Sequence, residues 1–113
     1  MSEHISSQFE NDILQINVNL TKMGGICEDN LKKAIKAITK NDSELAEYII
    51  KKDEELNALE SEIDDLVIKT IALRQPVADD LRLLFAAIKI SSAFERIGDL
   101  IKNIGKRTLL ISE

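Results

Sequence analysis

The sequence predicts an all-α fold: an up-down-up three-helix bundle with long antiparallel helices, in a single domain over residues 1–113. Apolar residues recur every three or four positions in three long segments, the pattern of amphipathic helices. Four glycines and one proline are too few for a sheet protein with many turns. Two short polar stretches separate the segments, and such short connections place consecutive helices side by side in opposite directions.

The first helix is expected to begin near Ser6 or Ser7 and to end near Thr39. Gly24 and Gly25 interrupt it, and each mid-helix glycine costs about 1 kcal/mol relative to alanine. The pair indicates either a local kink or a close approach of another helix or a ligand. The expected core face consists of Ile13, Ile16, Leu20, Met23, Cys27, Leu31, Ala34 and Ile38.

A polar turn at residues 40–43 precedes the second helix, which Asp42 or Ser43 can cap through a side-chain oxygen. This helix is expected to end near Leu73. Its expected core face consists of Leu45, Ile49, Leu56, Leu59, Ile63, Leu66 and Thr70.

The second turn is Arg74-Gln75-Pro76, and Pro76 suits the first position of a helix because its missing N–H would have no partner there. The third helix is expected to run from this turn to about Leu109. Its expected core face consists of Leu83, Ala87, Ile90, Phe94, Ile97, Ile101 and Ile104.

Composition and charge exclude several classes of protein. A net charge of −5 disfavours a nucleic-acid binder held by phosphate contacts and suits a cation or a basic partner. Cys27 is the only cysteine, which suits a reducing compartment. The N-terminal residues lack the pattern of a signal peptide, and no apolar run approaches the roughly 18 residues of a membrane span. A soluble cytoplasmic protein is therefore expected.

The acidic residues of the third helix are the main functional clue. Glu95 and Asp99 lie one turn apart, where like charges repel. Both continue the direction of Ile88, within about 20° at 100° per residue. We interpret Gly98, between them, as room for a neighbouring backbone. A second line of oxygen-bearing side chains, within about 40° of one direction, runs along the second helix: Asp53, Asn57, Glu60 and Asp64.

Distances along the chain from the turns predict which of these side chains share a level. One group is expected at a single level between the second and third helices: Asp53, Asn57, Glu95 and Asp99. Glu28 of the first helix reaches the same level, whereas Glu60 and Asp64 lie two turns nearer to the second turn.

A carboxylate cluster without His or Cys favours a hard cation such as Mg²⁺, Ca²⁺, Mn²⁺ or iron. The alternative is a solvated acidic face, in which Asp99 pairs with Lys102 one turn further on.

Five motifs in order carry a resemblance to a known family. They are Met23-Gly24-Gly25, Asp53 with Glu60-x-x-x-Asp64, Arg74-Gln75-Pro76, Asp80-Leu81-Arg82 and Glu95-Arg96-Ile97-Gly98-Asp99. With these motifs the chain resembles the N-terminal half of PhoU, the bacterial phosphate-uptake regulator, from about His4 to Arg107.

The resemblance implies a metal site. Glu95 and Asp99 match the family's metal motif, and Asp53 with position 57 matches its partner motif. Asn57 departs from this motif, because it offers a neutral carbonyl in place of a charge. Weaker candidates are Glu28, Glu60 and Asp64. The implied cofactor is a divalent or ferric ion: iron, zinc, manganese or magnesium.

The resemblance also implies a role. The family's members are cytoplasmic negative regulators of the phosphate regulon and are not enzymes. They link the ATPase subunit of the Pst transporter to the sensor kinase PhoR, and meet the membrane only through such partners. The chain holds one of the family's two repeats, which predicts either a fragment or a homodimer.

Two other functions remain open on the residues alone. One is a structural helical interaction module without metal. The other is a metal-dependent phosphohydrolase, which the paired carboxylates permit, although the sequence shows no Gly-rich phosphate loop and no nucleophile with a positioned base.

Overall fold

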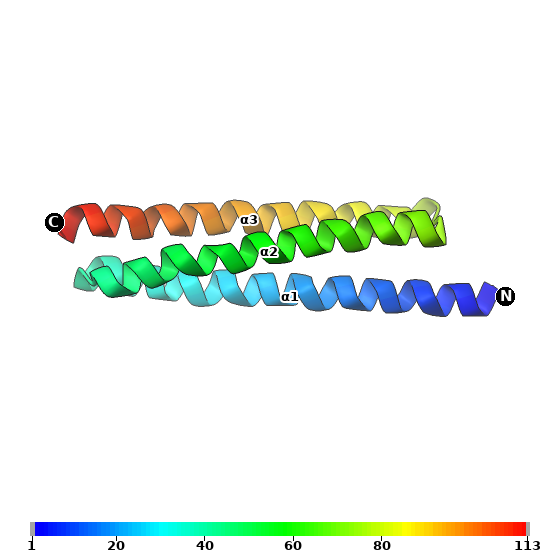
Figure 1. The fold of residues 1–113 in the computed structure, drawn as a ribbon, viewed down its shortest axis with the longest axis horizontal. Coiled ribbons are helices and arrows are strands. Elements are labelled where there is room, and N and C mark those ends of the chain that lie inside the picture. Colours follow the sequence, from blue (N-terminus) through cyan, green and yellow to red (C-terminus); the bar gives the residue numbers. More distant parts are fainter. Residues whose placement is uncertain (1, 113) are drawn as a thin grey trace.

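The computed structural model describes the backbone of residues 2–112 and the side chains of residues 7–112. Three helices, α1 (Ser2–Lys40), α2 (Ser43–Arg74) and α3 (Ala78–Ser112), lie side by side in a rod of 63 × 17 × 15 Å (Figure 1). α2 runs opposite to its two neighbours, so α1 and α3 are parallel. The predicted all-α, up-down-up bundle is confirmed. None of the helices in the described part of the chain is long and apolar enough to cross a membrane.

The helix boundaries follow the predicted turns with two differences. α1 begins at Ser2, several residues before the predicted start. α3 begins at Ala78, so the prediction that Pro76 is its first residue is wrong. Gln75 takes a left-handed conformation (φ 49°) and donates its N–H to the carbonyl of Ile71 at 3.0 Å. The reversal therefore uses residues 75–77, and Pro76 lies within the turn.

The first turn uses the predicted cap. Asp42 is the residue before α2, and its carboxylate accepts the backbone N–H of Leu45 at 3.1 Å. This bond satisfies one of the N–H groups that a helix start leaves without a partner.

The buried side of each helix follows a seven-residue repeat, which keeps one face turned inward along a slightly supercoiled bundle. In α3 this side is small in the middle, with Ser91, Gly98 and Gly105 buried at intervals of seven. The predicted core face of α3 is confirmed at Ala87 and Ile101, which are buried, and at Phe94 and Ile104, which pack against the core. It is wrong for Leu83, Ile90 and Ile97, which are 52%, 46% and 41% exposed. Small residues let a neighbouring helix approach closely, and the larger ones then lie at the edge.

The predicted core face of α1 is confirmed where its residues are buried, at Ile16, Met23, Cys27 and Ala34. It is wrong for Leu31 and Ile38, which are 42% and 41% exposed, while Ala37 is buried instead. The core prediction for α2 agrees better with the structure. Its buried apolar residues include the predicted Ile49, Leu56 and Ile63.

The glycines of α1 have different surroundings. α1 continues without a break through both of them. A Cβ on Gly24 would lie 3.2 Å from the Phe94 ring, so the close approach of another helix explains this glycine. A Cβ on Gly25 would meet nothing within 4 Å.

The glycines of α3 both face α2. A Cβ on Gly98 would lie 2.5 Å from Leu56 Cδ1 and 2.8 Å from Asp53 Oδ1. The neighbours of Gly98 are thus side chains, which corrects the expectation of a backbone. The backbone approach occurs at Gly105, whose Cβ would lie 3.2 Å from the Ala46 carbonyl oxygen.

These surroundings predict opposite effects for two glycine-to-alanine substitutions. Gly98→Ala should destabilise the fold by about 1–3 kcal/mol, because the added methyl group overlaps Leu56 and Asp53. Gly25→Ala should stabilise it by about 1 kcal/mol, because alanine is the better helix former and nothing obstructs it. Chemical denaturation of both variants measures the difference, and equal effects would contradict the packing at Gly98.

Candidate metal centre

The centre of the candidate site is the carboxylate of Asp53. It lies on the inward side of α2, where Gly98 leaves room for it, and only 2% of the residue is exposed. Its Oδ2 lies 3.8 Å from Lys102 Nζ. Its Oδ1 is buried without a hydrogen-bond partner among the described residues. A buried carboxylate oxygen without a partner is unfavourable, so this atom is free to accept a bond from a ligand.

Two carboxylates of α3 complete a cluster with Asp53. One oxygen of each of Asp53, Glu95 and Asp99 lies within 4.8 Å of the others. Asp53 is buried, Glu95 is half-buried and Asp99 is exposed, so the cluster opens from the helix interface to the surface. The structure thus brings together the three carboxylates among the four side chains that the sequence placed at one level, and the fourth side chain, Asn57, contacts Glu95.

Asn57, the fourth, lies beside this cluster on the exposed side of α2. With its amide nitrogen turned toward Glu95, the orientation that satisfies both groups, it donates to Glu95 Oε2 at 3.1 Å. In this orientation Asn57 is a donor to the cluster. Its carbonyl oxygen faces the cluster only if the amide rotates.

Burial and mutual repulsion act on the protons of the cluster. Burial, followed by the charges of Glu60, Asp53 and Asp99, raises the pKa of Glu95 to about 7. Burial also raises the pKa of Asp53, while Lys102 acts in the opposite direction. The negative charges are therefore incompletely compensated.

The weaker candidates lie outside the cluster. Burial, together with Asp64 and Asp99, raises the pKa of Glu60. When it is ionised, Glu60 in turn raises the pKa of Glu95. Glu28 is exposed on α1 and pairs with Lys32 at 3.4 Å, so the structure does not bring it to the cluster.

Two neighbours of the cluster were not predicted as such from the sequence. Lys102 pairs with Asp53 across the helix interface, whereas the sequence suggested a pair with Asp99. Cys27 of α1 is buried, and its thiol donates to the Phe94 carbonyl at 3.5 Å. Burial, then Asp53 and Glu95, raises the pKa of this thiol. Cys27 directly precedes Glu28, which the sequence placed at the level of the cluster. This neighbour was the signal that could have predicted Cys27 close to the cluster.

The donor set fits a hard cation. Three carboxylates converge, one buried oxygen has no partner among the described residues, and burial together with the neighbouring negative charges raises the pKa of Glu95, an effect that a bound cation would oppose. Asp53, Glu95 and Asp99 would hold such an ion.

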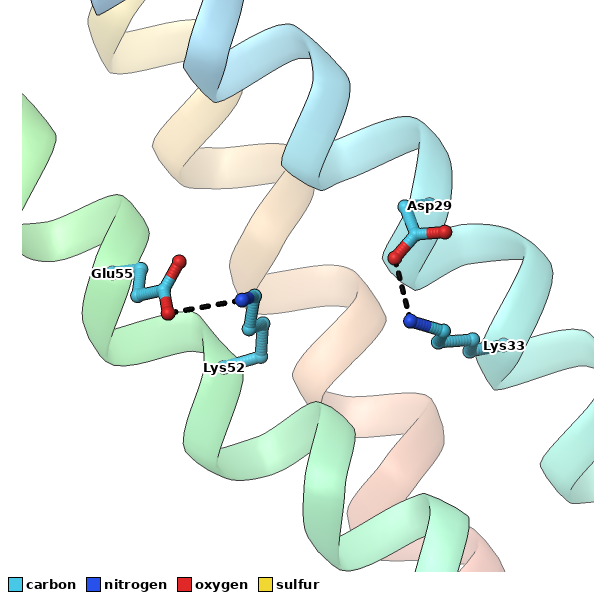
Figure 2. Close-up of polar contacts among 4 residues, drawn as sticks. All are labelled: Asp29, Lys33, Lys52 and Glu55. Carbon is cyan, nitrogen blue, oxygen red and sulfur yellow. Dashed lines mark hydrogen bonds and ion pairs between the residues drawn. The ribbon is translucent and has the colours of Figure 1, made fainter.

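A second concave feature is a groove of about 580 Å³ between α1 and α2. Its floor includes Gly25, Ile26 and Leu59, and charged side chains form its edges. Figure 2 shows that these charges are paired within each helix: Lys33 with Asp29 at 2.7 Å, and Lys52 with Glu55 at 2.9 Å. The paired charges lie on the two opposite edges, so they do not converge on one point in the groove.

The fold and the cluster define the class of this protein: a three-helix bundle with a carboxylate cluster between its second and third helices.

The PhoU domain matches residues 20–108, and the chain belongs to the PhoU family. It is 43% identical, over its whole length, to the phosphate-specific transport system accessory protein PhoU homolog of Caulobacter vibrioides, covering 49% of that protein. It is 42% identical over 109 residues to the PhoU protein of Serratia marcescens and 38% identical over 109 residues to that of Escherichia coli K12, covering 96% of this chain and 45% of each relative. The chain thus spans about half the length of the curated relatives it matches.

The raised pKa of Glu95 predicts how stability depends on pH. The proton stays on Glu95 to about pH 7 in the folded chain but leaves at lower pH in the unfolded chain. Its contribution to stability is therefore present below the unfolded pKa and is lost as pH rises through about 7. The melting temperature of the metal-free protein should fall between about pH 5 and about pH 8.

Glu95→Gln should make the melting temperature depend less on pH, because the substitution removes the carboxyl group that contributes most to this dependence. The raised pKa values of Asp53 and Glu60 should leave a smaller dependence. Glu62→Gln, on the exposed side of α2, is the control. Thermal melts over this pH range check the prediction, and a fall that is as steep in Glu95→Gln as in the wild type would contradict it.

Proposed function

We propose that this chain is a metal-binding regulatory module of phosphate uptake that acts as an adaptor and not as an enzyme. The observation that carries this proposal is the cluster of three carboxylates that includes the buried Asp53, whose Oδ1 has no partner among the described residues, in a chain of the PhoU family. Relatives named as accessory proteins of the phosphate-specific transport system support the role in phosphate uptake.

The metal's role in this proposal is structural. A divalent or ferric ion (iron, zinc, manganese or magnesium) would bind the carboxylates of Asp53, Glu95 and Asp99. It would offset the repulsion between α2 and α3, which burial of Asp53 strengthens because charges interact more strongly away from water. The ion would thereby hold the two helices at a fixed spacing and stiffen the surface around the cluster.

The proposed partners follow the family. The protein would act in the cytoplasm as a negative regulator of the phosphate regulon, between the ATPase subunit of the Pst transporter and the sensor kinase PhoR. It would reach the membrane only through these partners. Its net charge of −5 favours basic protein surfaces over nucleic acid.

We also propose that a further copy of this bundle covers one apolar surface, either in a homodimer or as a second repeat of a longer chain. We define the α1–α3 face by Leu31, Ile38, Leu83, Ile90 and Ile97. Leu31 and Ile38 follow Gly24, which touches Phe94 of α3, at intervals of seven. Leu83, with Phe9 and Ile13, lines a hollow between the same helices. Exposed apolar side chains aligned in this way are typical of interaction surfaces.

Asp99→Asn tests the metal proposal. The substitution should lower the metal bound per chain, because it removes one of three charges from the cluster while the exposed side chain leaves the fold intact. Elemental analysis of the purified protein measures this content. In cells, the same variant of the natural protein should raise expression from a phosphate-starvation promoter when phosphate is plentiful.

Asp65→Asn, on an exposed position of α2, is the matched control and should change neither readout. Metal content that is equal in Asp99→Asn and the wild type would favour the alternative of a structural module without metal. Hydrolysis of a generic phosphate ester by the metal-loaded protein would favour the phosphohydrolase.

Ile97→Lys tests the α1–α3 face. A charge at its centre should shift the protein toward the monomer in sedimentation velocity, since covering a lysine with an apolar surface is unfavourable. Ile68→Lys is the control, because Ile68 is 65% exposed on α2, away from this face. A monomer in the wild type over the micromolar range would count against the homodimer.

A further inference from the structure

Lys102 is the basic side chain that the structure brings into contact with the carboxylate cluster in the described part of the chain. It lies on α3, one turn beyond Asp99, and reaches across to Asp53 of α2. The Nζ–Oδ2 distance of 3.8 Å is too long for a hydrogen bond, so the contact is a loose ion pair. Its side chain is 32% exposed, which leaves the ammonium group a direct route into solvent.

We propose that Lys102 is a tethered counter-cation that occupies the place of the metal ion and determines which cations can enter the site. The inference rests on the proposed metal site and adds a residue that competes with the metal for Asp53.

The charge at the cluster explains why Lys102 only partly replaces a metal ion. Three carboxylates face one ammonium group, so negative charge remains when all three are ionised. Asp53 Oδ1 also stays without a partner although Oδ2 has one. Lys102 thus lowers the cost of burying Asp53 in the metal-free protein but leaves the donor set unsatisfied.

Tethering also predicts selectivity for the charge of the ion. Lys102 carries the same single charge as Na⁺ or K⁺ and is already held beside Asp53, so a monovalent ion gains little by replacing it. A multivalent ion carries more charge and can bind several carboxylates at once. The site should therefore admit divalent and trivalent cations and exclude Na⁺ and K⁺.

The first test compares Mn²⁺ binding to the metal-free full chain and to two variants by calorimetry. Lys102→Gln should bind Mn²⁺ about fivefold or more tightly than the wild type, because the competing cation is gone. Lys106→Gln is the matched control: Lys106 also acts on the charge of Asp53 but forms no ion pair with it among the described contacts. This control should stay within about twofold of the wild type.

The second test uses the wild-type chain, so it does not depend on how the variants fold. Mn²⁺ displaces the Lys102 ammonium group in this scheme, so acetylation of Lys102 measured by mass spectrometry should rise on saturation with Mn²⁺. Acetylation of Lys106 should stay constant. Added Na⁺ without Mn²⁺, at matched ionic strength, should leave Lys102 unchanged.

The outcomes separate this inference from the metal site itself. Equal Mn²⁺ affinities in the wild type and Lys102→Gln, with constant acetylation of Lys102, would overturn the role of Lys102 and leave the metal site in place. Equal gains in Mn²⁺ affinity in Lys102→Gln and Lys106→Gln would also overturn the role of Lys102, because they would indicate that any nearby positive charge weakens Mn²⁺ binding. Mn²⁺ binding by Lys102→Gln alone would support the role of Lys102. No Mn²⁺ binding by the wild type or by either variant would overturn both the metal site and the role of Lys102.

Discussion

The burial of one carboxylate constrains the centre of this bundle. Asp53 is 2% exposed at the contact of α2 with α3, a place where most bundles put an apolar side chain. It fits there because Gly98 has no side chain, and it is tolerated because Lys102 lies 3.8 Å away. The close packing of Gly98 against α2, the position of Lys102 and part of the raised pKa of Glu95 all follow from this buried charge.

The rod presents three different surfaces, one between each pair of helices. The surface between α2 and α3 is acidic around Glu95 and Asp99. The α1–α3 face is apolar and exposed, because small residues occupy the inward side of α3 and larger ones its edge. The groove between α1 and α2 has an apolar floor and paired charges at its edges. The three surfaces therefore differ in polarity, although the same three helices form them.

Sequence periodicity predicted the helices and turns well, since Asp42 and the polar turns are local signals. It wrongly assigned Leu83, Ile90 and Ile97 to the core of α3, because these apolar residues repeat every seven positions just as the buried small residues do. Hydrophobicity alone does not show which of two such stripes faces inward. The close approach at Gly105, where a helix backbone needs the space, decides it.

The sequence by itself determined the fold class, the family motifs and the shared level of Asp53, Glu95 and Asp99, because helix geometry and short turns leave little freedom along the bundle axis. Only the tertiary structure decided what surrounds each carboxylate. It placed Lys102 on Asp53 instead of Asp99, left Oδ1 without a partner, and turned Glu28 away to Lys32. These outcomes depend on how the helices rotate about their axes, which side-chain packing across all three interfaces determines.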